Sequence, residues 1–141
     1  MTAKQQFETV MTKMVNMALA TSVADRPNVR IVTFAYDAAK EGRLFFTTFK
    51  GNQKIREFEQ NPQVACMPLS SGDGEDVQVR IFGRVQKADI TVNDIISIIA
   101  KKYPDGAETI REGGEMLAVY EVCFEKIFLT VGMNEAQEIS F

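Results

Sequence analysis

The stretch from 77 to 86 constrains the fold most, because apolar and polar residues alternate along it with few exceptions. In an extended chain, Val79 and Ile81 would lie on one face and Gln78 and Arg80 on the other. A period of two residues is typical of a β-strand with one buried face. The sequence therefore predicts a sheet that covers a core with one face and presents polar groups on the other.

Further stretches are rich in β-branched and aromatic residues and end at turn-forming residues, as strands do. They cover residues 18–24, 28–36, 44–48, 64–69, 116–124 and 126–131. Apolar residues at helical spacing predict helices over about 3–16, 53–60 and 91–102. The remaining segments are predicted to be a short helix or loop at 105–114, a hairpin loop at 70–76 and a polar tail at 134–141.

Six to seven strands with few helices between them favour a mostly β fold. In a chain of 141 residues, an antiparallel sheet of this size is expected to close into a β-barrel with peripheral helices. The sequence contains no internal repeat and no linker-like segment, so residues 1–141 are expected to form a single domain.

Charge and hydropathy narrow the range of partners. The formal net charge is -3, so no basic field predicts nucleic-acid binding. Apolar runs are far shorter than the roughly 20 residues of a membrane-spanning helix. The first residues lack the apolar core of a signal peptide. We therefore expect a cytoplasmic protein that binds neither nucleic acid nor membrane.

The chain has no histidine, which argues against several kinds of catalytic and metal site. Ser-His-Asp and Cys-His catalysis both need an imidazole, and histidine is the commonest zinc ligand. Cys66 and Cys123 lie in apolar, strand-like sequence without metal-ligand spacing, and they are expected to be buried, reduced thiols. No catalytic residue and no metal site is assigned.

The start of the helix after the third predicted strand is a candidate anion site. Gly51 precedes it, and Lys50 and Lys54 flank it. Free backbone N–H groups are expected at Asn52, a suitable N-cap, and at Gln53, and such groups attract phosphate. An ordinary capped helix with solvated lysines explains the same pattern, so both interpretations stay open.

Arg30 adds to this argument because it shares a strand face with Val32 and Phe34. A guanidinium among apolar side chains is costly unless it has an anionic partner. The alternative is an edge strand with Arg30 in water. In the same way, Gln78 could hydrogen-bond the edge of a heterocyclic ligand or face solvent, and Thr47 could bind a ligand or fill a pleat.

Three blocks in a fixed order resemble a known family. They read NVRIVTF at 28–34, FFTTFKGNQKIREFEQNP at 45–62 and VQVRIFGRV at 77–85. The sequence thereby resembles the pyridoxamine 5'-phosphate oxidase-like FMN-binding split barrels, in particular the smaller bacterial members similar to general stress proteins. The resemblance implies an antiparallel FMN-binding split β-barrel. It also implies a homodimer with the flavin sites at its interface.

The resemblance implies roles for ten residues, grouped here by the part of FMN that each would contact. The phosphate would be bound by Arg30 and Lys54, with help from Asn52 and Gln53. The ring would lie along the main chain of Ile31, Val32 and Thr33. Its polar edge would contact Phe46, Thr47 and Gln78.

Departures from the family pattern limit the activity. The oxidases bind pyridoxamine phosphate through a C-terminal segment with Trp, Arg and His, whereas this chain has no Trp and no His. Gln53 stands where the oxidases carry arginine. Ala35 stands where they often carry lysine. The resemblance therefore implies an FMN-dependent oxidoreductase of unknown substrate, with NAD(P)H or another small molecule as the electron donor, rather than a true pyridoxamine phosphate oxidase. A flavin-binding or stress-related protein without turnover, and a related barrel with another ligand such as haem or a deazaflavin, or with none, stay open as alternatives.

Overall fold

The computed structural model describes residues 1–70 and 76–141. Within them the helices are α1 (Ala3–Lys13), α2 (Gln53–Gln60), α3 (Val92–Ala100) and α4 (Pro104–Gly113), followed by a 3-10 turn, η1 (Gly114–Met116). The strands are β1 (Asn16–Val23), β2 (Arg26–Ala35), β3 (Arg43–Phe49), β4 (Gln63–Pro68), β5 (Val77–Lys87), β6 (Leu117–Cys123), β7 (Lys126–Val131) and β8 (Gln137–Ser140). The hairpin loop predicted at 70–76 lies, except for its two ends, outside the described residues.

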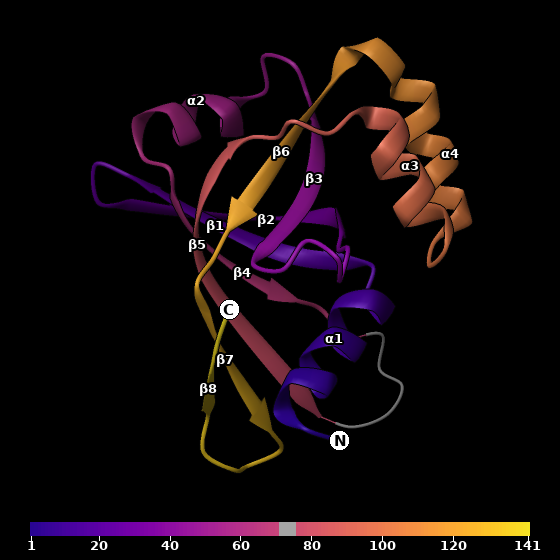
Figure 1. The fold of residues 1–141 in the computed structure, drawn as a ribbon. Helices are drawn as coiled ribbons and strands as arrows, with labels where there is room; N and C mark the ends of the chain where they lie inside the picture. The colour runs from indigo at the N-terminus through magenta and orange to yellow at the C-terminus, as the bar shows by residue number, and fades with distance from the viewer. Residues whose placement is uncertain (71–75) are drawn as a thin grey trace.

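The predicted antiparallel barrel is confirmed. Six strands run in the order β4-β1-β2-β3-β6-β5, and pairing of β4 with β5 closes the ring. β7 and β8 extend the sheet beyond β5 (Figure 1). Closure depends on β5, which pairs with β7 over residues 77–81 and with β6 over 84–87. Gly83 lies at this change of neighbour, where a Cβ would come within 2.5 Å of the Cys123 carbonyl oxygen, so a larger residue would push the strands apart.

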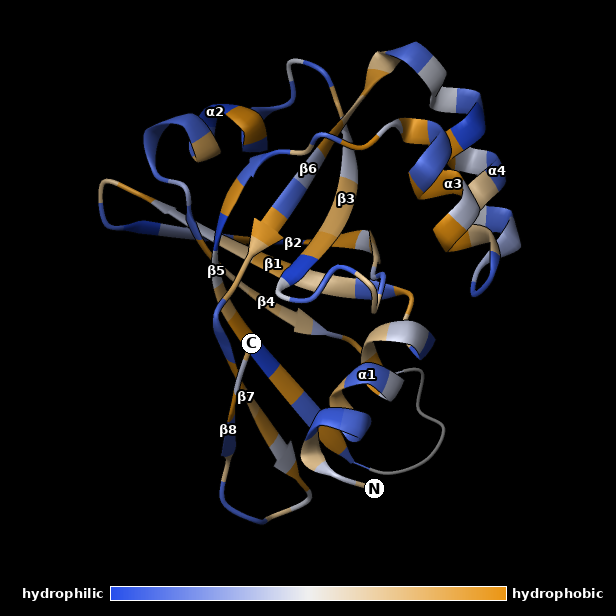
Figure 2. Cartoon of the chain, viewed as in Figure 1, coloured by the Kyte–Doolittle hydropathy of each residue, from blue (hydrophilic) through white to orange (hydrophobic). Residues whose placement is uncertain are grey.

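Two hydrophobic cores hold the fold together. The larger fills the barrel and is covered by α1, whose Phe7 side chain is fully buried. Along β5, hydrophobic residues that face this core alternate with hydrophilic ones, as predicted (Figure 2). The second core lies between the α3–α4 pair and the outside of the barrel, and it includes Phe45 and Ile95. β2 contributes to both cores, with Phe34 in the first and Ala35 in the second.

Two segments differ from the prediction. The polar tail predicted at 134–141 is wrong, because β8 pairs with β7 and the Phe141 ring packs against Phe7 with centroids 4.9 Å apart. β8 is four residues long and mostly exposed, so it lacks the buried apolar face that a sequence pattern would show. The first helix ends at Lys13, earlier than predicted, because Met14 already has an extended backbone. No helix in the described part of the chain is long and apolar enough to cross a membrane.

Lys102, just after α3, ties the helix pair to α1. Its Nζ donates hydrogen bonds to the carbonyl oxygens of Met14 at 2.7 Å and Met11 at 3.4 Å. The same ammonium lies 3.8 Å from the centroid of the Phe34 ring. The negative end of α1 and the face of the ring both favour the charged form, whereas burial lowers the pKa of Lys102 to about 8.

This lowered pKa makes the stability of the fold depend on pH. Because the pKa of Lys102 is about 8 in the folded chain and 10.5 ordinarily, the unfolded chain binds more protons above pH 8. The free energy of unfolding should therefore rise with pH, by about 1 kcal/mol between pH 8 and 9 from this group. Chemical denaturation at both pH values checks this, since the wild type should gain that amount relative to Lys102→Gln. Equal pH dependence in the two proteins would contradict it.

Candidate functional site

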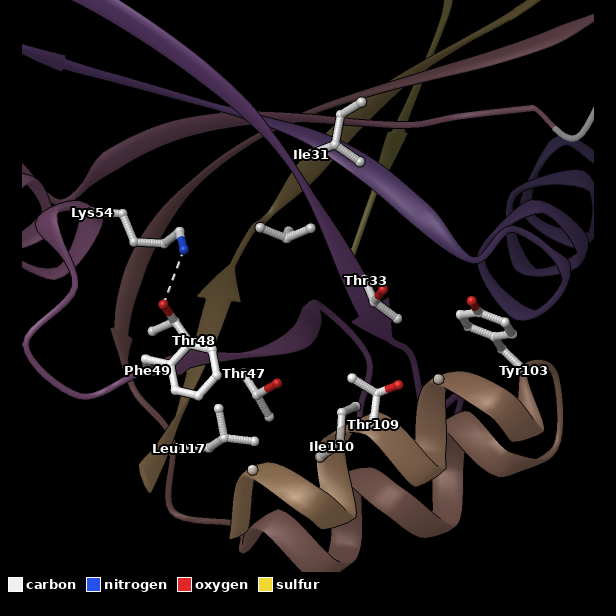
Figure 3. Close-up of a pocket in the computed structure, with 13 residues that line it drawn as sticks. Ile31, Thr33, Thr47, Thr48, Phe49, Lys54, Tyr103, Thr109, Ile110 and Leu117 are labelled. Carbon is white, nitrogen blue, oxygen red and sulfur yellow. Dashed lines mark hydrogen bonds between the residues drawn. The ribbon is translucent and has the colours of Figure 1, made fainter. Parts of the chain in front are cut away.

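A cavity of about 340 Å³ lies between the barrel and α4. Its walls are β2, the end of β3 with the start of α2, and the face of α4 next to the start of β6 (Figure 3). Five of the ten residues implied in cofactor binding line it: Ile31, Val32, Thr33, Thr47 and Lys54. The volume is in the range of small-molecule sites. The fold therefore brings a strand main chain, two threonines and a lysine together on one cavity.

Lys54 supplies the positive charge of this cavity. Its Nζ donates a 3.0 Å hydrogen bond to the Thr48 hydroxyl, and Figure 3 shows both side chains at one end of the cavity. Burial lowers the pKa of Lys54, the nearby Arg30 charge lowers it further, and Glu57 acts in the opposite direction. Among the described residues, no carboxylate lies within ion-pair distance of this ammonium. A bound anion would therefore find Lys54 uncompensated.

The start of α2 is a capped helix terminus, as predicted. Gly51 has a φ of 80°, a left-handed conformation that favours glycine, and the Asn52 side chain accepts a 3.1 Å hydrogen bond from the Lys54 N–H. The expectation of a free N–H at Asn52 is wrong, because that N–H donates to the Phe49 carbonyl oxygen at 3.1 Å. Asn52 and Gln53 flank the cavity lining instead of forming part of it.

Arg30 has its anionic partner inside the protein. Its Nη2 lies 2.7 Å from Glu57 Oε1 in an ion pair that is largely buried, with side chains 20% and 11% exposed. Its Nη1 donates to the Thr21 hydroxyl at 2.9 Å and to the Leu19 carbonyl oxygen at 3.4 Å. The Arg30 side chain is therefore not in water, although β2 at residue 30 pairs with β1 alone among the described strands, as an edge strand would. Arg30 is also not among the residues that line the cavity, so its role in phosphate binding stays a prediction.

Two further residues of the expected ring edge lie elsewhere. The Phe46 side chain is fully buried in the barrel core, where its ring packs against Phe58 and Tyr120. Only the main chain of Phe46 could therefore contact a ligand. Gln78 is exposed on β5 opposite Thr130 of β7 and is not among the lining residues.

The wall formed by α4 was not predicted from the sequence. The segment predicted as a short helix or loop is an α-helix, with Pro104 in its first turn. Its contribution to the lining, with the residue before it, is Tyr103, Gly106, Thr109, Ile110 and Gly113. A Cβ at Gly106 would overlap the Tyr103 ring, so this glycine lets the ring lie against the helix. Glycines seven residues apart on one helix face were the available signal, but they indicate close approach and not a ligand.

The closed six-stranded barrel with two appended strands is a split barrel. The family model described as pyridoxamine 5'-phosphate oxidase-like matches residues 10–136, and the chain belongs to this family. No curated protein sequence is significantly similar to the chain.

Solved structures with this fold carry several different functional names. General Stress Protein 26 from Bacillus anthracis str. Sterne superposes with a TM-score of 0.74 at 15% identity, over 100% of both chains. A heme-binding protein from Mycobacterium smegmatis superposes at 0.77 with 12% identity, over 99% of this chain and 58% of that one. HutZ, a heme storage protein from Vibrio cholerae, superposes at 0.67 with 16% identity, over 93% of this chain and 95% of that one. At these identities the likeness establishes the fold alone.

Proposed function

We propose that the chain binds FMN in the Lys54 cavity and acts as an FMN-dependent oxidoreductase with NAD(P)H or another small molecule as the electron donor. The observation that carries this proposal is the position of Lys54, an uncompensated cation at one end of a cavity whose wall is the extended strand at 31–33. A phosphate monoester would pair with the ammonium. A planar ring would lie along the strand, where apolar Ile31 and Val32 flank it. Membership of the family supports the choice of flavin.

The chain's own residues would bind and orient the cofactor and keep water from it. The Thr33 hydroxyl donates to Asn16 Oδ1 at 2.9 Å, so its lone pairs are left to accept from a ligand N–H. Thr47 offers a second hydroxyl, and Phe49 and Leu117 provide apolar cover. FMN itself supplies hydride or single-electron transfer when bound, so no separate acid or base is assigned.

Haem is the ligand named for two of the structural relatives, and the chemistry of this cavity fits it less well. The chain has no histidine, and the cavity lining includes neither cysteine nor methionine. Histidine, cysteine and methionine are the usual axial ligands of haem iron. Tyr103 is the phenol that lines the cavity, and tyrosine is a less common haem ligand.

Titration of the purified protein with FMN, followed by absorbance and flavin fluorescence, tests the proposal. Anaerobic addition of NADH or NADPH to the complex should then bleach the flavin band. Saturable FMN binding without bleaching by any donor would favour a flavin-binding protein without turnover. Saturable haem binding with no response to FMN would contradict the proposal and favour a barrel for another ligand.

We also propose that two copies assemble as a homodimer that covers this cavity. An exposed apolar face crosses β2, β1, β4 and β5, and includes Val29, Ile31, Met67 and Phe82. In the strand register Ala18 lies directly between Ile31 and Met67, which makes the face continuous. Exposed apolar patches of this kind mark interaction sites. Ile31 also lines the cavity, so a partner on this face would border the ligand.

The dimer is tested by sedimentation or light scattering. The wild type should have twice the mass of one chain, and Phe82→Glu should shift it to the monomer. Met133→Glu, on a fully exposed apolar residue in the turn between β7 and β8, is the control and should stay dimeric. A monomeric wild type would contradict the assembly.

We further propose a cytoplasmic location. Cys66 is buried and Cys123 is half-buried, and both are free thiols. Burial raises the pKa of Cys66 to about 12 and contributes most to raising that of Cys123 to about 11. Neither thiol is therefore ionised at neutral pH, and free thiols are usual in that compartment.

A further inference from the structure

We propose that Glu57 sets the charge preference of the Lys54 cavity: its ion pair with Arg30 makes the site a weak binder of phosphate dianions, so that FMN is held as an exchangeable ligand. This inference rests on the proposed function, because it concerns the same site. Nothing in the family resemblance or in the relatives assigns a role to Glu57.

Glu57 is not among the residues that line the cavity, but its charge acts on Lys54, and both of its carboxylate oxygens are engaged. Oε1 accepts from Arg30 Nη2 at 2.7 Å and from Asn28 Nδ2 at 3.4 Å. Oε2 accepts from the Thr21 hydroxyl at 2.7 Å. The residue is 9% exposed, so solvent screens its charge little. A carboxylate held by three donors from two strands stays in place.

The carboxylate and the two cations act on one another. Glu57 follows Lys54 by three residues on α2, a spacing that places side chains side by side on a helix. The pKa of Lys54 responds to both neighbours, lowered by Arg30 and raised by Glu57. With Glu57 ionised, the group Arg30, Lys54 and Glu57 carries one net positive charge instead of two. A dianion at Lys54 therefore meets half the positive charge that the two cations alone would present.

The opposite role for Glu57 makes a distinct prediction. If the carboxylate serves only to hold the Arg30 guanidinium in place, its removal should loosen that group and weaken phosphate binding. If the Glu57 carboxylate offsets the positive charge of Arg30, removal of the carboxylate should strengthen phosphate binding. The sign of the change in affinity separates the two roles.

Glu57→Gln is the decisive variant, because it keeps the shape of the side chain and removes its charge. We expect the Kd for FMN to fall about tenfold, because the variant removes one negative charge near a partly buried dianion. The Kd for riboflavin, which lacks the phosphate, should change by less than about twofold. Glu59→Gln, an exposed position on the same helix, is the matched control and should change neither. An FMN affinity that is unchanged or weaker in Glu57→Gln would overturn the proposal.

Inorganic phosphate, titrated by calorimetry into the wild type and Glu57→Gln, separates this proposal from the flavin assignment. Tighter phosphate binding in the variant, with no flavin binding in either protein, would support the role of Glu57 and contradict the proposed function. Flavin binding that is no tighter in the variant than in the wild type would support the proposed function and contradict the role of Glu57. Phosphate and flavin affinities that are both unaffected would overturn the proposal.

The wild type alone provides a second measurement, should Glu57→Gln fail to fold. If Glu57 neutralises Arg30 and leaves Lys54 as the one cation for the phosphate, FMN should bind no more than about thirtyfold more tightly than riboflavin at low salt. A preference above about a hundredfold would show that the full charge of Arg30 reaches the phosphate, and would overturn the proposal.

Discussion

Replacing Arg30 with methionine is expected to lower the free energy of unfolding by about 3 kcal/mol. The substitution leaves the Glu57 carboxylate buried with its closest cation removed, and an unpaired buried charge is among the most destabilising features of a protein. Urea denaturation of the two proteins measures the loss. A loss below about 1 kcal/mol would show that solvent, not Glu57, stabilises this guanidinium.

Two further variants make this test specific. In Arg30→Met/Glu57→Met both charges are gone, so stability should recover by at least about 1 kcal/mol relative to Arg30→Met. Arg26→Met is the matched control, because Arg26 is exposed at the start of the same strand and should change stability by less than about 0.5 kcal/mol. A double variant no more stable than Arg30→Met would contradict the ion-pair account.

Lys54→Met is expected to weaken FMN about thirtyfold, which corresponds to about 2 kcal/mol. The ammonium is the uncompensated cation of the cavity, and methionine keeps most of its aliphatic length while removing the charge. Riboflavin affinity should stay within about twofold, because the lost interaction is with the phosphate. Fluorescence titration with both ligands measures the two affinities.

Lys50→Met is the matched control for this prediction. Lys50 lies four residues earlier, in the turn before α2, and is exposed, outside the cavity lining. Its removal changes the net charge equally but should leave FMN affinity within about twofold. Equal losses of FMN affinity in Lys50→Met and Lys54→Met would mean that the affinity depends on the general charge of this region and not on a contact in the cavity.

Local signals explain why parts of the fold could be predicted from sequence. The alternation along β5 identified a half-buried strand, and the burial pattern follows it residue by residue. The bounds of α2 were predicted correctly because an N-cap at Asn52 and a proline at Pro62 mark its two ends. Lys54 was predicted from the same local pattern, and it lines the cavity.

The remaining features depend on contacts between distant segments. The partner of Arg30 is 27 residues away on another element, and no local pattern indicates it. Phe46 is buried on a strand whose Phe45 is buried on the opposite side, so the sequence shows no period of two from which to assign its face. α4 became a cavity wall through its packing against the barrel, which its glycines and polar residues do not reveal.

A crystal structure of the protein grown with FMN tests the central claim most directly. The account predicts the phosphate within hydrogen-bond distance of Lys54 Nζ, the ring against residues 31–33, and Arg30 still paired with Glu57. FMN bound away from this cavity, or a cavity filled by the protein's own side chains in the presence of excess FMN, would contradict the account.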